Sequence, residues 1–352
     1  MLLKSLVRGF IAAGLAIALL LGAQKSYCKE APAALPGKMV RPGAPGPTQV
    51  SIGIWIADLS RIDSAEQTFA ANLVLGISWR DPSLAHGEPI AVRYNLADIW
   101  HPNWLIANAT TNLQATFPEI AEVAADGLVT YRQRLIGTFS QQLDLRKFPF
   151  DSAIFRIHFV SVGQTPAELQ FVPNEAMVAD GMPSGAGIDR HLTLQDWKIS
   201  DVNTRVLPYQ DVPGFNLAGY AVEFKATRLV QHYIAKVIIP LLLIVIMSWA
   251  AFWLNPGMGS TQASIAVTSM LTLIAYRSAV GVETPRLPYL TNLDAFILVS
   301  SVLVLLTLVE VVVTTTLVSR QQVDLARKID RYSRYAFPAA YVAVSTVTLL
   351  LR

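Results

Sequence analysis

The sequence lacks most of what an enzyme or a metalloprotein needs. It contains 1 cysteine, Cys28, so no disulfide can form within the chain. Its 5 histidines are scattered, without the spacing of metal ligands. We find no Ser/His/Asp arrangement, no glycine-rich phosphate loop and no cofactor motif in it. We therefore expect that the protein is not an enzyme and that it holds no metal ion or cofactor. We assign no catalytic residue.

Charge is also scarce. Only 15% of the 352 residues are charged and the net charge is +3, which gives no support to a nucleic-acid partner. Hydrophobic residues make up 53% of the chain, more than an ordinary soluble domain contains. The composition therefore predicts membrane spans.

The N-terminal region predicts a secretory signal peptide over residues 1–23. Lys4 and Arg8 stand at the start of a short apolar run, and small residues follow it. The alternative interpretation of this run is an N-terminal membrane anchor. Residues 24–48 are expected to form a flexible lead, because Pro, Gly and Ala dominate from residue 31 onward.

Residues 49–228 show the period of β-strands. Apolar and other residues alternate in four clear runs, namely 50–57, 72–79, 155–159 and 220–227. Such runs, separated by Pro, Gly, Asp and Asn, are typical of half-buried strands in a sandwich. About 180 residues of this kind predict one all-β domain of immunoglobulin-like type with a single core.

The C-terminal region, residues 229–352, predicts an all-α bundle of four membrane spans. Each apolar stretch is near the roughly 20 residues that a helix needs to cross a bilayer. The spans are expected at about 233–254, 261–282, 293–317 and 335–351. The connection 318–334 is basic, which is typical of cytoplasmic segments. The β domain is then outside, in agreement with the signal peptide.

The second span has one face unlike the others. Steps of three and four residues place small, polar and apolar side chains in one row, namely Ser264, Thr268, Leu271, Ala275, Ser278 and Val282. A ring of copies would line water with these hydroxyls, and Leu271 would form an apolar constriction that closes by dewetting. The alternative is that the hydroxyls only bond to their own or a neighbouring helix.

The segment Phe148-Pro149-Phe150-Asp151 resembles the signature loop of the Cys-loop receptor superfamily. Animal members flank this loop with two cysteines. Gln141 and Phe155 stand at the corresponding places here, which resembles the bacterial branch of pentameric ligand-gated ion channels. The resemblance covers roughly residues 48–352. It continues in three further segments, namely Ile239-Pro240, Pro285–Tyr289 and Phe337-Pro338.

The resemblance implies a homopentamer in a bacterial inner membrane, with the N-terminal domain periplasmic or extracellular. The second spans would line the pore, and membrane lipid would surround the ring. The sandwich would transmit gating to the membrane domain through several residues, namely Glu66, Phe148, Pro149, Asp151, Arg228, Glu283, Arg286 and Pro288. Asp151 and Arg228 would pair, with Glu66 or Asp63 as a candidate third member. The alternative is that these are solvated surface charges.

The ligand and the permeant ion are less specified. The resemblance places the ligand site between subunits, with five candidate residues: Trp55, Trp104, Val162, Tyr209 and Phe215. An aromatic cage would bind an amine, but this set lacks two of the usual aromatics, so another small molecule or protons stay open as agonist. Each aromatic has sandwich core as its alternative role. We expect permeant inorganic ions, with cations favoured, although Arg277 lies inside the span.

A different class of function is a membrane-anchored extracellular sensor, or a binding protein associated with a transporter, without a pore. Transporters usually have more spans and repeated halves. Four spans with one polar face favour the oligomeric pore.

Overall fold

The computed structural model describes residues 40–43, 45–174, 176–177, 180–182, 184–283 and 287–351. The expected signal peptide over residues 1–23, Cys28, most of the lead 24–48 and the coupling candidate Arg286 lie outside them. The backbone of Val282 and Glu283 is described, but their side chains are not.

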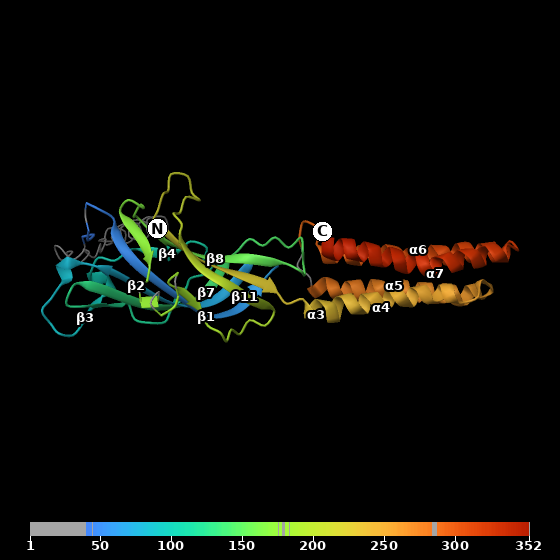
Figure 1. Ribbon diagram of the computed structural model, residues 1–352, viewed down its shortest axis with the longest axis horizontal. Coiled ribbons are helices and arrows are strands. Elements are labelled where there is room, and N and C mark those ends of the chain that lie inside the picture. The colour runs from blue at the N-terminus through green and yellow to red at the C-terminus, as the bar shows by residue number, and fades with distance from the viewer. Residues whose placement is uncertain are drawn as a thin grey trace, which may run out of the picture.

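The chain forms two parts arranged end to end, a β-sandwich and a bundle of helices (Figure 1). The larger sheet of the described chain has the order β10-β1-β2-β7-β6-β3, with β5 on β7 and β9 on β1. Its strands are β1 (Thr48–Asp63), β2 (Thr68–Arg80), β3 (Val92–Asn95), β5 (Gln114–Ala115), β6 (Ile120–Val123), β7 (Leu128–Ser140), β9 (Leu169–Pro173) and β10 (Ala186–Ile188). The smaller sheet has the order β11-β12-β8-β4, with β4 (Trp104–Ile106), β8 (Ser152–Ser161), β11 (Trp197–Val206) and β12 (Gly219–Arg228).

The predicted sandwich is confirmed, and its core follows from the alternation in the sequence. Val50, Ile52 and Ile54 on β1 point inward and are fully buried, because successive side chains of a strand face opposite sides. Phenylalanine rings join the two sheets near the centre. Phe69 of β2 lies 5.3 Å from the ring centroid of Phe155 on β8, edge to face.

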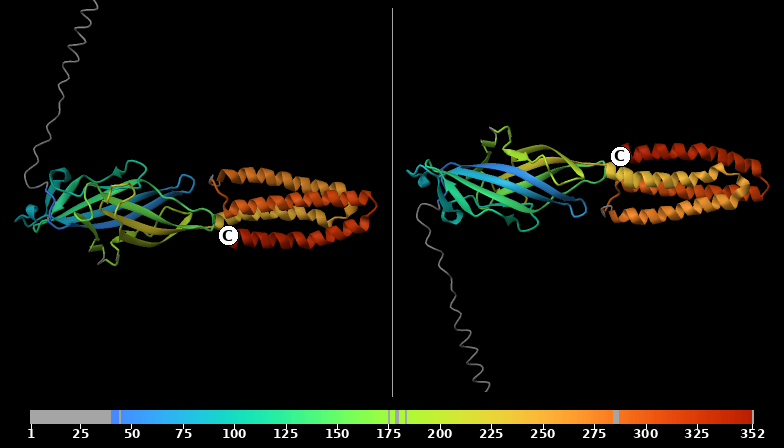
Figure 2. Two further views of the ribbon diagram at one scale, coloured as in Figure 1. Left: turned by 90° about the horizontal axis from the view of Figure 1, so that it is seen from above. Right: turned by 90° about the horizontal axis from the view of Figure 1, so that it is seen from below.

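Four helical segments follow and lie side by side (Figure 2). The first comprises α3 (Gln231–Tyr233), the π-helical turn η3 (Ile234–Ile238), α4 (Ile239–Trp249) and the 3₁₀ turn η4 (Ala250–Trp253). After the turn η5 (Pro256–Met258) come α5 (Gly259–Glu283), α6 (Asn292–Ser319) and α7 (Val323–Thr346), which ends in the π-helical turn η6 (Val347–Leu351).

Three helices in the described chain are long and apolar enough to cross a membrane, namely Gln231–Trp253, Pro256–Gly281 and Asn292–Ser319. The fourth, α7, is not among them, because charged residues occupy its first half. Much of the expected connection 318–334 is helical, since α7 begins at Val323. Hydropathy locates the end of an apolar run, whereas a polar amphipathic helix continues past it. The fourth span at 335–351 stays a prediction.

Candidate pore, coupling interface and ligand surface

Arg228 and Asp151 form a buried ion pair where the sandwich meets the helices. Arg228 Nε donates to Asp151 Oδ1 at 2.8 Å, and its Nη2 donates to Oδ2 at 3.1 Å. The two side chains are only 5% and 3% exposed. The backbone N–H of Arg228 also donates to the Asp151 carbonyl at 3.2 Å. Such a two-pronged, charge-assisted contact fixes both position and orientation. It joins the last strand, β12, to the loop before β8.

Aromatic rings enclose the Arg228 guanidinium. Its central carbon lies 4.1 Å from the Trp197 ring centroid, 4.9 Å from that of Phe148 and 5.9 Å from that of Tyr233. A weakly hydrated, planar cation is well suited to stacking of this kind. Because Tyr233 belongs to the first membrane helix, the guanidinium contacts both the sandwich and the helix bundle. Trp197 and Tyr233 were missed from the sequence, because nothing in their local pattern shows which ring a distant arginine will meet.

The Phe148–Asp151 loop contacts the start of α6 through backbone hydrogen bonds. Leu293 N–H donates to the Phe148 carbonyl at 3.2 Å, and Asn292 N–H donates to the Arg146 carbonyl at 2.9 Å. The Tyr289 hydroxyl accepts from Leu145 N–H at 3.1 Å. Phe148 and Pro149 are buried, and the peptide bond between them is cis. The loop is thus bonded directly to the segment that links α5 to α6.

The remaining coupling candidates are placed differently. Ser64, rather than Glu66 or Asp63, is the third member of the pair, since its hydroxyl accepts from Arg228 Nη2 at 2.8 Å. Asp63 instead pairs with Arg61 and accepts from the Glu66 N–H, which lowers its carboxyl pKa. Glu66 is exposed in the same turn, and Pro288 is exposed in the α5–α6 connection. A surface turn offers several polar residues, and spacing alone did not select among them.

The α5 helix has two opposite faces. One packs against α4 and α6 and buries Gln262, Ala266, Ser269 and Leu273 completely or nearly so. The row Ser264, Thr268, Leu271, Ala275 and Ser278 is exposed, with Leu271 62% exposed. Ser264, Thr268, Leu271 and Ala275 each follow a buried residue by two positions, a rotation of about 200° around the helix. The row therefore points directly away from the bundle.

Two hydroxyls on the exposed row bond to the helix itself, as one interpretation of the sequence expected. Ser264 Oγ donates to the Ser260 carbonyl at 2.9 Å, and Ser278 Oγ donates to the Ile274 carbonyl at 3.1 Å. The O–H groups are thus used within the helix, while the oxygen lone pairs face outward. Arg277 is exposed beside the row and lines a crevice of about 250 Å³ with Asp294. Asp294 itself accepts from the backbone N–H and hydroxyl of Thr291, the N-cap residue of α6.

The ligand candidates do not converge within one chain. Trp55 lies on the outer face of the larger sheet, in a hollow of about 720 Å³ whose lining includes Gly53, Gly76 and Arg132. The other four belong to the smaller sheet and its loops. Trp104 packs toward the core beside Phe159, as its alternative role as core residue expects. A site that combines the two sheet faces requires a second subunit.

Tyr209 and Phe215 lie in the hairpin that connects β11 to β12. Tyr209 and Leu217 exchange backbone hydrogen bonds at 2.9 and 3.1 Å, which closes the hairpin. The Tyr209 ring lies 5.8 Å from His158, while Phe215 and Val162 are exposed. The hairpin therefore presents one exposed aromatic ring, and a second one that rests on the sheet.

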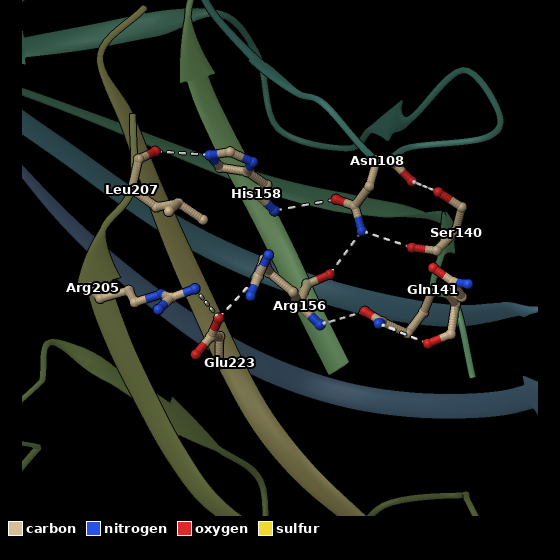
Figure 3. Close-up of polar contacts among 9 residues, drawn as sticks. Asn108, Ser140, Gln141, Arg156, His158, Arg205, Leu207 and Glu223 are labelled. Carbon is tan, nitrogen blue, oxygen red and sulfur yellow. Dashed lines mark hydrogen bonds and ion pairs between the residues drawn. The ribbon is translucent and has the colours of Figure 1, made fainter. Parts of the chain in front are cut away.

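His158 organises a polar network next to this hairpin (Figure 3). Its Nε2 lies 2.8 Å from the Leu207 carbonyl, and its backbone N–H donates to Asn108 Oδ1 at 3.1 Å. Asn108 Nδ2 in turn donates to the carbonyls of Ser140 and Arg156. Burial of the imidazole lowers its pKa below 6.5, despite the opposing effect of the Leu207 carbonyl. His158 is therefore neutral at pH 7, with its Nε2–H donating to Leu207.

Sequence comparison agrees with this architecture. The profile of the neurotransmitter-gated ion-channel ligand binding domain matches residues 37–214, and that of the neurotransmitter-gated ion-channel transmembrane region matches residues 237–324. The chain belongs to the neurotransmitter-gated ion-channel family. The resemblance stated from the sequence is thereby confirmed. The family consists of channels rather than enzymes. Its members are multi-pass membrane proteins with an extracellular N-terminal ligand-binding domain.

Two relatives illustrate the breadth of the family. The chain is 27% identical over 325 residues to the proton-gated ion channel of Gloeobacter violaceus, which covers 88% of this chain and 85% of the relative. It is 26% identical over 281 residues to a gamma-aminobutyric acid receptor subunit beta of Caenorhabditis elegans, covering 77% of this chain and 50% of the relative. The chain thus spans about half the length of the second relative.

Proposed function

We propose that this chain is one subunit of a homopentameric channel of the bacterial inner membrane, gated from outside by a small molecule or protons and conducting small cations. The exposed row on α5 is the observation that carries this proposal. A lipid-facing surface gains nothing from the hydroxyls of Ser264, Thr268 and Ser278, whereas a water-filled pore does. A single bundle has no water-lined interior for this row, and five copies around an axis provide one.

Leu271 is the proposed gate. It is the large apolar side chain of the row, with Thr268 one turn toward the cytoplasmic end and Ala275 one turn toward the sandwich. A ring of five leucines forms a narrow apolar constriction in the pore. Water leaves such a constriction, and hydrated ions then cannot pass. Val282, at the outer end of the row, stays a pore-lining prediction.

Selectivity for cations is supported by the direction of the hydroxyls. Since the O–H groups of Ser264 and Ser278 donate to backbone carbonyls, the oxygen atoms present lone pairs to the pore. Lone pairs attract cations and repel anions. Arg277 lies one position, or about 100°, from Ser278 around the helix, so it is beside the pore face rather than on it. Glu283 is the proposed acidic residue at the outer end.

Gating is proposed to pass through the Arg228–Asp151 pair and the Phe148 loop. The pair joins β12, the loop before β8 and Tyr233 of the first membrane helix. The loop holds Asn292 and Leu293 at the start of α6. A change in the sandwich that moves this loop would displace the α5–α6 connection, where Pro288, Glu283 and Arg286 are the remaining coupling candidates.

The agonist site is proposed between neighbouring subunits. The face of the larger sheet that carries Trp55 would meet the Tyr209–Phe215 hairpin of the next copy. An amine would be held by ring faces. The relative named as proton-gated supports protons as the other agonist class.

The mass of the purified, detergent-solubilised full chain tests the assembly. Native mass spectrometry of a pentamer gives five times the subunit mass, and the detergent contribution is removed in the gas phase. A monomer would contradict the pore proposal and favour the membrane-anchored sensor.

A further inference from the structure

The helix bundle contains an acidic pair at the end remote from the sandwich. Glu310 of α6 and Asp330 of α7 are 9% and 1% exposed. Their four carboxylate oxygens are buried, and none has a hydrogen-bond partner among the described residues. Asp330 lies within the connection expected at residues 318–334. The packing of α6 against α7 brings the two residues together.

The surroundings of the pair are polar but supply little charge. The Glu310 carboxyl faces Asp330 and Ser333, and Asp330 faces Gln262 of α5 and Arg334 of α7. Gln262 is fully buried and donates Nε2 to the Ala251 carbonyl at 3.0 Å. Its Oε1 has no partner in the described part of the chain. The site thus holds five buried oxygen atoms that make no hydrogen bond to any described residue.

The nearest cation is committed elsewhere. Arg334 Nε donates to the Phe252 carbonyl at 2.8 Å, and its guanidinium stacks 5.1 Å from the Trp253 ring centroid. No ion pair joins Arg334 to either carboxylate within the described residues, where only Asp324–Arg327 pairs on this helix. The sequence from Ile239 to Tyr276, which forms α4, η4, η5 and most of α5, has no acidic, basic or histidine residue. The other charges of α7 are exposed, namely Asp324, Arg327, Lys328 and Arg331.

Two ionised carboxylates in such a place are strongly disfavoured. Burial removes their hydration, and the two like charges repel each other. A single proton placed between them removes one charge and supplies an O–H donor to the other carboxylate, as in other paired acids. With Arg334 nearby, the protonated pair leaves the cluster close to neutral. No group of three or more His, Cys, Asp or Glu that could hold a metal ion occurs among the described residues, which favours a proton over a metal ion at this pair.

We propose that Glu310 and Asp330 form a proton-binding site between α6 and α7, and that the pair shares one proton at neutral pH. Gln262 connects this site to α5, two residues before Ser264 in the exposed row. Loss of the proton places a second negative charge beside the Gln262 amide and draws its N–H away from the Ala251 carbonyl. The site therefore makes the start of α5 sensitive to pH on that side of the membrane. This last step rests on the proposed pore, whereas proton binding does not.

Infrared spectroscopy of the full-length protein in lipid vesicles tests the binding directly. Wild type at pH 7 is expected to show the carbonyl stretch of a protonated carboxyl, shifted by D₂O. The stretch should be shifted or lost in Glu310→Gln and Asp330→Asn, absent in the double variant and unchanged in the matched control Asp324→Asn. No such stretch in wild type at pH 7 overturns the proposal, whether or not the variants fold. So does a stretch that persists in the folded double variant.

Changing the metal cation in the buffer distinguishes a bound proton from a bound metal ion. The same wild-type spectrum is recorded in potassium, sodium and calcium at constant pH. A stretch that is indifferent to the ion supports the proton. A stretch that disappears when sodium or calcium is added assigns the site to that metal and overturns the proposal.

Current measurements test the link to the pore. In inside-out patches carrying Leu271→Ser, alkaline internal solution is expected to change the current several-fold, and the added double variant Glu310→Gln/Asp330→Asn should abolish the change. An unchanged dependence on internal pH in that variant contradicts the link. If Leu271→Ser gives no current at all, the proposed channel function fails, while the infrared result still decides proton binding.

Discussion

Removing one partner of the Arg228–Asp151 pair is expected to destabilise the sandwich strongly. Both side chains are almost fully buried, so Arg228→Gln leaves the Asp151 carboxylate without its two charge-assisted donors. Breaking a buried pair in this way costs about 3–5 kcal/mol. With a denaturant slope of about 3 kcal/mol per molar urea, the unfolding midpoint would fall by about 1 M or more.

The Arg156–Glu223 pair provides the matched control in the same sheet. Arg156 Nε donates to Glu223 at 2.7 Å, but these side chains are 42% and 21% exposed. Glu223 also keeps Arg205 as a partner at 3.1 Å. Exposed pairs contribute about 0.2–1 kcal/mol, so Arg156→Gln should shift the midpoint by about 0.3 M or less.

Two further variants separate charge from packing. Arg228→Lys keeps the charge but loses the two-pronged contact and the stack on Trp197, so it should behave more like Arg228→Gln than like wild type. The double variant Arg228→Met/Asp151→Leu should recover much of the loss, because no charge is left buried alone. Tryptophan fluorescence during urea unfolding reads all of these, since Trp197 contacts the guanidinium. If Arg228→Gln costs no more than Arg156→Gln, the pair does not hold the sandwich in the way described.

Three more outcomes follow from single contacts. Because burial lowers the pKa of His158, the unfolded chain binds a proton at this imidazole more readily than the folded chain, so stability is lost as pH falls below about 6.5. Between pH 7 and 5, His158→Gln should therefore lose less stability than wild type. Equal losses in the two proteins would contradict this role of His158. Tyr289→Phe removes the acceptor of Leu145 N–H, a loss of about 0.5–1.5 kcal/mol, and should speed hydrogen exchange of the Leu145 amide; unchanged exchange would be incompatible with the contact. Thr291→Ala removes the cap of α6 at a cost of about 0.5–2 kcal/mol, which thermal unfolding detects against the exposed control Thr316→Ala.

The β-sandwich and the helix bundle could be predicted from the sequence, because the spacing of apolar residues distinguishes strands from helices. Alternation over residues 50–57 requires one face of a strand to be buried, and β1 has that face. The polar row on α5 is similarly periodic, and its exposed side agrees with the steps of three and four residues. The exposure of Leu271 was therefore predictable, because a helix converts spacing along the sequence into direction around its axis. Its role as the gate stays a prediction.

Contacts between distant segments could not be predicted in the same way. Ser64 and Trp197 contact Arg228 from distant parts of the sandwich, and Tyr289 of the α5–α6 connection accepts from Leu145 N–H. No local pattern encodes these contacts. Glu310 and Asp330 are 20 positions apart on two helices, so only the packing of α6 against α7 shows that they form a pair. The proposed ligand site combines aromatic candidates from two subunits, and no pattern within one chain predicts how two copies would meet.

The central claim is that the exposed row of α5 lines a pore closed by Leu271. Whole-cell current in cells expressing Leu271→Ser, compared with wild type and with the buried-face control Leu273→Ser at several salt gradients, tests it most directly. We predict a standing current in Leu271→Ser alone, with a reversal potential that follows the cation gradient. Absence of current, with surface labelling showing that the protein has reached the membrane, would contradict the assignment.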